Sequence, residues 1–279
     1  MITKAYAKIN LTLDITGVRP DGFHTLRSVM VPVTLSDDII IEKSDSFTFD
    51  CNIKSICGDN NLCVRAAKAF FEYIKASPDV SIYLDKKVPF PAGLGGGSSD
   101  AAAVLSGLNE MYGNPVSDSD LFEIAASLGS DIPFCLLGRP ALCEGRGEVL
   151  TPISLDDEFN VVITIGEGRL PTADVYRRYD SACLEVRNDT DAFLSAVNNN
   201  DFSGIVASLG NAFEPVTDAL CPETKTMREL MISFGALASH LSGSGPSVYG
   251  IFSDSQKAEI AAQEMRNKGF SAFVCKTKK

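Results

Sequence analysis

A glycine-rich segment at residues 89–99 is the part of the chain best suited to chemistry, and it reads Pro-Phe-Pro-Ala-Gly-Leu-Gly-Gly-Gly-Ser-Ser. Glycines leave few side chains in the way, so backbone N–H groups can approach a ligand closely. The segment runs into an expected helix at residues 101–111, whose free N–H groups and positive dipole end would attract an anion. The segment therefore predicts a phosphate site. A flexible turn before a capped helix is the alternative interpretation.

The residues around these glycines exclude two common phosphate-binding motifs. A P-loop of the Walker A type needs Gly-Lys followed by Ser or Thr, and no lysine follows the glycines. A Rossmann fingerprint needs a further spaced glycine, and Ser98 stands in its place. The predicted phosphate site is therefore of another kind.

A lysine and an asparagine lie on one face of the first expected strand. Apolar and polar residues alternate along residues 8–15, which predicts a half-buried strand with Lys8 and Asn10 on its polar face. Such side chains are usually solvated. The lysine would take part in chemistry only where the fold brings it beside the glycine segment, because there it could attract phosphate oxygens.

Asp131 lies between the end of an expected helix at residues 121–128 and an apolar run. Aspartate is common in such a place as the cap of a helix or turn. A carboxylate held at the edge of the core could instead orient an attacking hydroxyl in phosphoryl transfer. The residues alone leave both interpretations open.

Several further residues have weaker support. Phe23 and His24 follow a turn, and such a pair can stack on a base and hydrogen-bond it, although composition favours a packed ring and a surface histidine. Arg146 between two glycines suits a reaching cation or a charged turn, and Tyr176 suits the core or a stacking platform. His240 has no partner that is visible in the sequence, so we interpret it as structural.

The pattern of apolar residues predicts the elements that must position these groups. Strands are expected at residues 8–15, 28–33, 38–42, 80–84, 161–165, 247–252 and 272–276. Helices are expected at residues 62–76 (capped by Asn60 or Asn61), 101–111, 121–128, 191–198, 223–234 and 256–267. Helices and strands do not alternate regularly, which favours an α+β fold over a doubly wound sheet. Acidic residues at 152–159 are the expected link between two domains, 1–153 and 154–279.

Composition and charge exclude several classes of protein. The chain has 279 residues, of which 45% are hydrophobic and 22% charged, as is ordinary for a folded protein. Its net charge of −11, without a basic stripe, argues against a nucleic-acid partner. No apolar run approaches the roughly 18 residues of a membrane helix, and no secretory signal is visible. The 8 cysteines lack the spacing of a metal site, which indicates free thiols in a reducing cytoplasm.

Two glycine segments together are similar to those of a known family. Pro89-x-x-x-Gly93-Leu-Gly-Gly-Gly-Ser-Ser99 resembles the phosphate loop of the GHMP kinases, which include galactokinase, homoserine kinase and mevalonate kinase. Ser242-Gly-Ser-Gly-Pro-Ser-Val resembles the C-terminal glycine motif of that family. One branch of the family, the kinases of 4-diphosphocytidyl-2-C-methyl-D-erythritol, is similar in four more segments: Ala7-Lys8-Ile-Asn10-Leu, Asp21-Gly-Phe23-His24-Thr-Leu, Gly129-Ser-Asp131-Ile-Pro-Phe and Glu144-Gly-Arg-Gly-Glu148.

The resemblance implies an α+β protein with the two-domain GHMP kinase fold. An N-terminal α/β domain would carry the glycine-rich phosphate loop, and the C-terminal domain would be ferredoxin-like. The implied activity is ATP-dependent phosphorylation of the 2-hydroxyl of the cytidine-diphosphate-linked methylerythritol in the non-mevalonate isoprenoid pathway. ATP and Mg²⁺ would be the cofactors. The protein would act on this small molecule in the cytoplasm as a monomer or homodimer, without nucleic acid or membrane.

The resemblance also implies a catalytic pair. Asp131 would position or deprotonate the acceptor hydroxyl, and Lys8 would stabilise negative charge on the nucleophile and on the transferring phosphoryl group. The residues implied to wrap the ATP phosphates are Pro89, Phe90, Pro91, Ala92, Gly93, Leu94, Gly95, Gly96, Gly97, Ser98 and Ser99.

Other residues are implied to bind the substrate. Asn10 would order the catalytic strand, and His24 would pair with the edge of the cytosine. Phe23 and Tyr176 would flank the nucleotide end, while Arg146 would contact the diphosphate.

The chain departs from the family at a few positions. Phe23 stands where tyrosine is common, so a hydroxyl contact is lost and the aromatic face remains. Asn211-Ala-Phe-Glu214 stands where Asn-Asp-Leu-Glu is common, which weakens any role of the acidic position. Related kinases bind magnesium through a loop serine and a separate glutamate. Ser99 could serve, but no such glutamate is identified, so we predict no metal ligands.

Two other functions remain as alternatives. One is a GHMP kinase for another small alcohol, such as homoserine or a mevalonate derivative. The other is a GHMP-fold sensor that binds nucleotide and ligand without catalysis. Phe23 and His24 favour the cytidine substrate, since the other acceptors need no base-stacking residues. Lys8 and Asp131 argue against a sensor, which has no need of a pair that activates a nucleophile.

Overall fold

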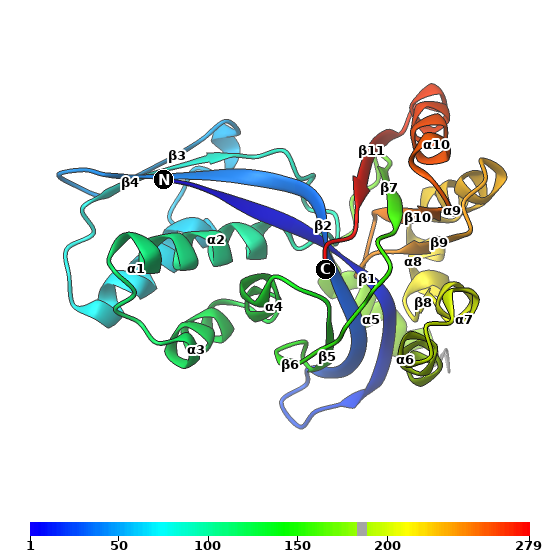
Figure 1. Cartoon of the computed structure of the whole chain (residues 1–279), viewed down its shortest axis with the longest axis horizontal. Coiled ribbons are helices and arrows are strands. Elements are labelled where there is room, and N and C mark those ends of the chain that lie inside the picture. Colours follow the sequence, from blue (N-terminus) through cyan, green and yellow to red (C-terminus); the bar gives the residue numbers. More distant parts are fainter. Residues whose placement is uncertain (183–188) are drawn as a thin grey trace. The chain divides into compact units, whose positions relative to one another are not determined.

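The chain divides into two compact units that each draw on separate stretches of the sequence (Figure 1). The computed structural model describes residues 1–182 and 189–279, so Cys183, one of the thiols expected to be free, lies outside the described residues. The first unit comprises Met1–Ala7, Ser36–Pro89 and Gly95–Gly138, and the second comprises Lys8–Leu35, Phe90–Leu94 and Arg139–Lys279. The long strands β1 (Ile2–Val18) and β2 (His24–Lys43) contribute residues to both. The domain boundary expected at residues 153 and 154 stays a prediction.

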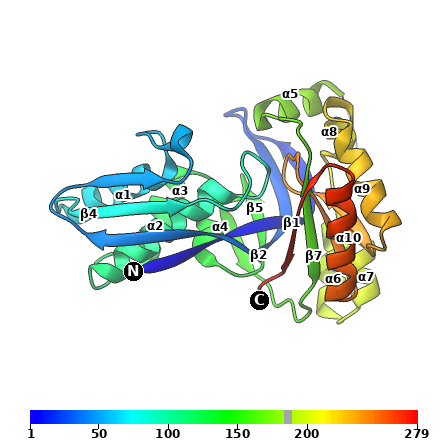
Figure 2. The same ribbon diagram turned by 90° about the horizontal axis from the view of Figure 1, so that it is seen from above.

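In the first unit, helices cover one face of a group of strands (Figure 2). Its complete elements are β3 (Thr48–Cys51), the 3₁₀ helix η1 (Lys54–Ile56), α1 (Leu62–Ile74), β4 (Val80–Asp85), α2 (Gly96–Met111), α3 (Asp118–Leu128) and α4 (Ile132–Leu137). β4 pairs antiparallel with residues 38–43 of β2 and parallel with β3.

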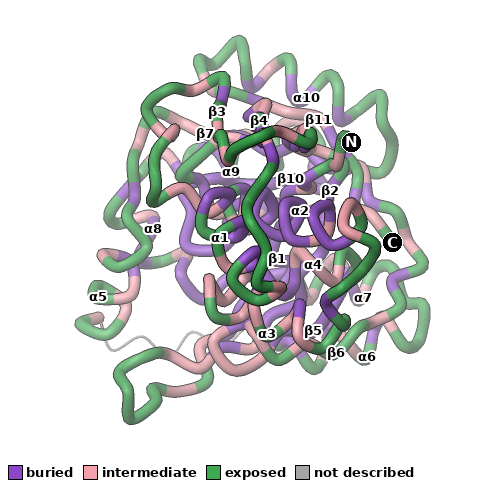
Figure 3. The backbone as a smooth tube through the Cα atoms, turned by 90° about the vertical axis from the view of Figure 1, so that its left-hand side faces the viewer, coloured by how far each residue is buried: buried purple, intermediate pink, exposed green. Residues whose placement is uncertain are grey.

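Helices α1 and α2 form the centre of the core of this unit. The side chain of Asn61 accepts a hydrogen bond from the backbone N–H of Cys63 at 2.9 Å, which confirms the expected cap of α1. Phe70 is fully buried on the inner face of α1. Alanines at 101, 102 and 103 let α2 lie close to its neighbours. Most residues of α2 are buried (Figure 3).

The second unit contains a four-stranded antiparallel sheet. Its order is β11-β7-β10-β9, with β7 at Asn160–Ile165, β9 at Ala238–Leu241, β10 at Val248–Phe252 and β11 at Ser271–Lys276. Helix α9 (Glu223–Ser233) precedes β9, and α10 (Ser255–Asn267) lies between β10 and β11. The resulting β-α-β-β-α-β sequence, with helical segments inserted after β7, is that of a ferredoxin-like fold and confirms the expectation.

The rest of the second unit holds shorter elements. They are β5 (Ala141–Gly145), β6 (Val149–Pro152), α5 (Thr172–Ala182), α6 (Thr190–Asn198), α7 (Phe202–Ala207), β8 (Gly210–Asn211) and α8 (Glu214–Leu220). β5 pairs antiparallel with β2 and β6, and β8 pairs parallel with β1. Across the described residues, no helix is both long and apolar enough to cross a membrane.

The structure corrects several expected boundaries. The strands expected at 28–33 and 38–42 are one strand, β2, because its two halves pair with different partners, β5 and β4. Helix α2 begins at Gly96 and not at Ala101, since the N–H of Ser99 already donates to the carbonyl of Gly95 at 2.8 Å. The pattern also fails to predict β3, β5, β6, β8, β9, α4, α5, α7 and α8, most of which are too short to show a period.

Phe70→Ala should lower the free energy of unfolding by about 3–5 kcal/mol, because the ring is fully buried and its loss leaves a cavity. Urea unfolding followed by circular dichroism measures the change. Glu72→Ala, on the exposed face of the same helix, is the control and should shift stability by no more than about 0.5 kcal/mol. Equal effects of the two substitutions would contradict the assigned core.

Candidate active site

Lys8 and Asn10 are buried side chains in a hydrogen-bonded chain on β1. Nζ of Lys8 donates to Oδ1 of Asn10 at 2.7 Å, and Nδ2 of Asn10 donates to the hydroxyl of Ser28 at 2.7 Å. Only 3% of Lys8 and 1% of Asn10 is exposed, so the solvated alternative is wrong for both. Because buried polar groups are costly unless they are paired, this chain fixes the ammonium in one place.

Two glycine segments meet backbone to backbone beside Lys8, all within the second unit. A Cβ atom on Gly93, whose φ is +75°, would lie 2.2 Å from the carbonyl oxygen of Ser242, so only glycine fits there. The hydroxyl of Ser242 donates to the carbonyl of Gly93 at 3.0 Å. A Cβ atom on Gly243 would lie 3.5 Å from Nζ of Lys8. The backbone N–H of Lys8 donates to the carbonyl of Leu94 at 2.9 Å, which ties the strand to the first segment.

Residues that the sequence left without a role hold the second glycine segment. Nδ2 of Asn211 donates to the carbonyls of Leu241 and Gly243 at 2.9 and 2.8 Å. Oε1 of Glu214 accepts from the N–H of Leu241 at 3.0 Å and lies 3.0 Å from Nδ1 of His240. The partner of His240 is thus Glu214, 26 residues earlier, which spacing alone could not have found.

Electrostatics keep the Glu214 carboxylate charged. Burial acts to raise the pKa of this carboxyl. The hydrogen bond from His240, the charges of His240 and Arg228 and the N–H of Leu241 outweigh burial and lower the pKa overall. Arg228 completes the pair through a 2.9 Å contact between its guanidinium and Oε2 of Glu214.

The residues predicted to hold a nucleotide base gather at the beginning of β2. The rings of His24 and Tyr176 lie 4.8 Å apart between centroids, and Tyr176 also packs at 4.8 Å against Phe213. Nε2 of His24 lies 2.6 Å from Oδ1 of Asp180, a residue that the sequence did not suggest. The ring orientation of His24 is therefore set by an acidic neighbour on α5.

Phe23 and Arg146 lie together in the same unit. Phe23 is 56% exposed, and the guanidinium carbon of Arg146 lies 5.4 Å from the centre of its ring. The arginine is held from the other side by Glu148, whose Oε1 lies 3.5 Å from its Nε. An exposed ring beside a cation leaves an aromatic face open to a ligand.

In the first unit, α2 begins with two glycines and therefore with little side chain. Gly95 is its N-cap in a left-handed conformation, and within the described residues no side chain caps this end. The hydroxyl of Ser99 donates to the carbonyl of Gly96 at 3.0 Å, so it folds back onto the first turn. The free donors and the helix dipole fit an anionic polyphosphate, as the sequence predicts.

Asp131 also belongs to the first unit, at the N-cap position of α4. Its backbone is in the α-helical region, and the side chain makes no cap hydrogen bond to α4 among the residues described. Its own carbonyl accepts from the N–H of Cys135 at 3.1 Å. The cap interpretation of this carboxylate is therefore wrong, and Asp131 is half-buried at the edge of the core.

The first unit contains a buried ionic cluster next to the beginning of α2, which the sequence analysis did not predict. Nζ of Lys86 lies 2.5 Å from Oδ2 of Asp37 and 2.7 Å from Oδ2 of Asp100. No side chain of the three is more than 4% exposed. Burial raises the pKa of the Asp100 carboxyl to about 8, with the Lys86 charge acting against this and the Asp37 carboxylate adding to it. No single position in the sequence signals such a cluster, because its members come from three elements.

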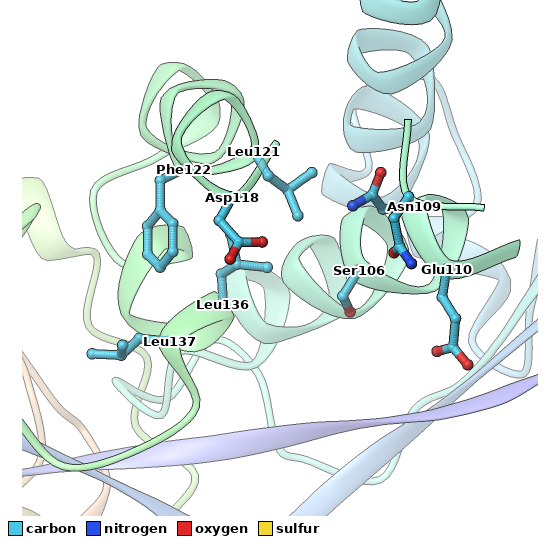
Figure 4. Close-up of a pocket in the computed structure, with 9 residues that line it drawn as sticks. Ser106, Asn109, Glu110, Asp118, Leu121, Phe122, Leu136 and Leu137 are labelled. Atoms are coloured by element: carbon cyan, nitrogen blue, oxygen red, sulfur yellow. The ribbon is translucent and has the colours of Figure 1, made fainter. Parts of the chain in front are cut away.

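Within the described residues, neither a metal site nor the cavity between α2, α3 and α4 coincides with the predicted residues. Over residues 1–182 and 189–279, no three acidic, histidine or cysteine side chains are grouped to hold a metal ion. A cavity of about 510 Å³ opens between α2, α3 and α4 (Figure 4). Glu110 and Asp118 line it beside apolar Phe122 and Leu136. Its carboxylates would repel a phosphate, so this cavity does not replace the predicted site.

Sequence comparison assigns both halves of the chain to one family. Residues 61–139 match the family described as GHMP kinases N terminal domain, and residues 182–271 match GHMP kinases C terminal. The chain belongs to the GHMP kinases. It is therefore a small-molecule kinase that uses ATP, which confirms the expected enzyme class and the resemblance on which it rested.

Individual relatives indicate which branch of the GHMP kinases the chain resembles. The chain is similar to a 4-diphosphocytidyl-2-C-methyl-D-erythritol kinase of Caldicellulosiruptor saccharolyticus, with 39% identity over 95% of this chain and 93% of the relative. A kinase of the same name from Clostridium acetobutylicum is 35% identical over 99% of this chain and 100% of its own. A crystal structure of 4-(cytidine 5'-diphospho)-2C-methyl-D-erythritol kinase superposes with a TM-score of 0.87 at 33% identity and covers both chains completely. The expected two-domain fold is thereby confirmed.

The raised pKa of Asp100 predicts a measurable pH dependence of stability. The folded protein binds this proton more tightly than the unfolded chain, so the group stabilises the fold below the ordinary carboxyl pKa and loses that effect as pH rises through about 8. Asp100→Asn removes the dependence. The free energy of unfolding of the variant relative to the wild type should rise between about pH 4 and 8, by at most about 1.4 kcal/mol per pH unit.

Asp38→Asn, at the position after Asp37, is the matched control for this experiment. Hydrogen bonds from Lys4 and Lys87 lower the pKa of Asp38, so this carboxylate stabilises the fold above its ordinary pKa. The control should therefore lose stability relative to the wild type only as pH rises to about 4, and the difference should stay level between about pH 4 and 8. Urea titrations at a series of pH values measure both differences, and a control that rises over about pH 4 to 8 as Asp100→Asn does would refute the assignment to Asp100.

Proposed function

We propose that the chain transfers the γ-phosphoryl group of ATP to the 2-hydroxyl of 4-diphosphocytidyl-2-C-methyl-D-erythritol, in the synthesis of isoprenoid precursors by the non-mevalonate pathway. The observation that carries this proposal is the identity of 33–39% with kinases of that name over nearly the whole chain. The neighbouring His24 and Tyr176 rings support it, because aromatic side chains suit a flat base.

In this reaction, the chain's own residues bind, orient and stabilise charge. We assign the ATP phosphates to residues 89–99, whose N–H groups and helix N-terminus favour anions. The Lys8 ammonium stabilises negative charge on the transferring group, and Asp131 orients the acceptor hydroxyl or takes its proton. Asn10 accepts a hydrogen bond from Lys8 and thereby keeps the ammonium in place. Mg²⁺ would neutralise phosphate charge, and we assign no residue of the chain as its ligand.

The substrate side follows from the aromatic groups of the second unit. His24 pairs with the cytosine edge, with its ring orientation set by Asp180. Tyr176 and Phe23 provide apolar faces for the nucleotide end. Arg146 contacts the diphosphate, since a guanidinium can hold two phosphate oxygens at once.

The remaining features of the protein are assigned in the same way. We place it in the cytoplasm, because all seven described cysteines are free. We expect a monomer or homodimer.

Two alternatives remain, and each has an observation against it. A kinase for homoserine or a mevalonate derivative would not need the group formed by His24, Tyr176 and Asp180. A sensor would not need a lysine buried at 3% exposure beside two glycine segments.

The direct test is ADP release from MgATP in the presence of 4-diphosphocytidyl-2-C-methylerythritol, homoserine, mevalonate or galactose. We expect turnover with the cytidine compound alone. Turnover with a different acceptor would agree with the proposed phosphate site but would refute the proposed cytidine substrate. Nucleotide binding by a folded protein that turns over none of the four would favour the sensor.

Asp131→Asn should reduce kcat by about 10²–10⁴, the range for a lost general base, while the affinity for ATP changes little. Steady-state kinetics give kcat, and calorimetric titration with nucleotide gives the affinity. Asp118→Asn, an exposed aspartate of the same unit, serves as the control and should behave as the wild type. Unchanged turnover in the Asp131 variant would remove this residue from the mechanism.

A further inference from the structure

The glycine segment leaves the first unit after Pro89 and returns to it at Gly95. The Lys86 cluster, defined as Lys86, Asp37 and Asp100, lies next to both of these points. Lys86 directly follows β4, Asp37 belongs to β2, and Asp100 belongs to the beginning of α2. The cluster thus joins three elements that are distant in sequence.

Asp37 holds the chain immediately before the segment. Its Oδ1 accepts from the backbone N–H of Lys87 at 2.5 Å and from that of Val88 at 2.7 Å. Its Oδ2 accepts from the Lys86 ammonium at 2.5 Å. One fully buried carboxylate therefore fixes three consecutive residues.

Lys86 and Asp100 hold the chain immediately after the segment. The ammonium donates to Oδ2 of Asp100 at 2.7 Å. It also lies against the first residue of α2, since a Cβ atom on Gly96 would be 2.9 Å from Nζ of Lys86 and 3.2 Å from Cγ1 of Val88. A side chain at position 96 would collide with the ammonium, so glycine is needed there. Its backbone angles do not require glycine.

We propose that the Lys86 cluster is a clasp that fixes both ends of the phosphate-binding segment, and that Lys86 is a positioning residue for the nucleotide. The inference rests on the proposed function insofar as the segment binds ATP. Fixing both ends shortens the stretch of chain that must be ordered when the polyphosphate binds, which lowers the entropy lost on binding.

The net charge of the cluster also suits a position close to an anion site. Lys86 carries one positive charge, and two ionised aspartates would leave a net negative charge under the phosphates. Burial raises the pKa of Asp100 to about 8, so at neutral pH this carboxyl is mainly protonated and the cluster is close to neutral. Burial acts to lower the pKa of Lys86, but Asp100 and Asp37 outweigh it and raise this pKa, so the lysine stays charged.

Lys86→Met is the central variant, because it keeps most of the side-chain volume and removes the ammonium. Hydrogen–deuterium exchange of the unliganded protein and calorimetric titration with MgADP are the two measurements. We expect exchange of the amides at residues 89–99 to become about tenfold faster and the Kd of MgADP to rise about tenfold, as is usual for displaced binding groups. The KM of the acceptor should stay unchanged, because the clasp touches only the nucleotide segment.

Lys87→Met serves as the control. It removes the neighbouring lysine, which is 49% exposed and pairs with Asp38 on the surface, so exchange and affinity should match the wild type.

A lysine removed from between two buried carboxylates can prevent folding. In that case, Lys86→Met/Asp37→Asn/Asp100→Asn replaces the whole cluster by neutral side chains of similar volume and carries the same expectations. Unchanged exchange at residues 89–99 in a folded Lys86 variant, or equal effects in Lys87→Met, would overturn the clasp. Both measurements are independent of the acceptor, so loss of the proposed substrate would not be mistaken for loss of the clasp.

Discussion

The close approach of two backbones is the constraint on which the glycine segments of the second unit depend. The position where Gly93 would carry a Cβ atom is 2.2 Å from a carbonyl of the other glycine segment, so no side chain can separate them. The Lys8 ammonium lies beside this contact because its own backbone N–H is bonded to Leu94. Asn211 and Glu214 hold the other segment through its carbonyls and an N–H. Each of these groups would be misplaced if a side chain widened the gap.

The site places charges inside the protein, and partners that offset the loss of hydration accompany them. Lys8 donates to Asn10, and Glu214 receives hydrogen bonds from three directions. Such buried polar groups contribute little net stability, since desolvation cancels most of the attraction. What they supply is a single geometry, because removing any one partner leaves another group unpaired. A site that must hold phosphate oxygens benefits from fixed donors, which need no rearrangement when charge develops.

The sequence predicted local features well and long-range pairings poorly. Alternation along residues 8–15 identified β1, and Asn61 was among the expected caps of α1. The same alternation placed Lys8 on a solvated face, but Lys8 is buried with the second glycine segment against its ammonium, which period two cannot reveal. The partners of His24 and His240 lie 156 and 26 residues away, beyond any motif. The resemblance to the family supplied the candidate site residues as a set, and their individual roles stay predictions.

The groups proposed to select the acceptor lie on other elements than the segment proposed to bind the phosphates. His24, Tyr176 and Asp180 come from the beginning of β2 and from α5, and none belongs to a glycine segment. The two sets are linked by a 2.9 Å hydrogen bond between the hydroxyls of Thr172, at the beginning of α5, and Ser244, and by the packing of Tyr176 on Phe213. The contact between Gly93 and Ser242 is made by backbone atoms and a serine hydroxyl, so the acceptor-binding side chains of α5 can differ without taking part in it. Kinases with one phosphate site can in this way serve different alcohols, since the acceptor is chosen by residues that the phosphate site does not need.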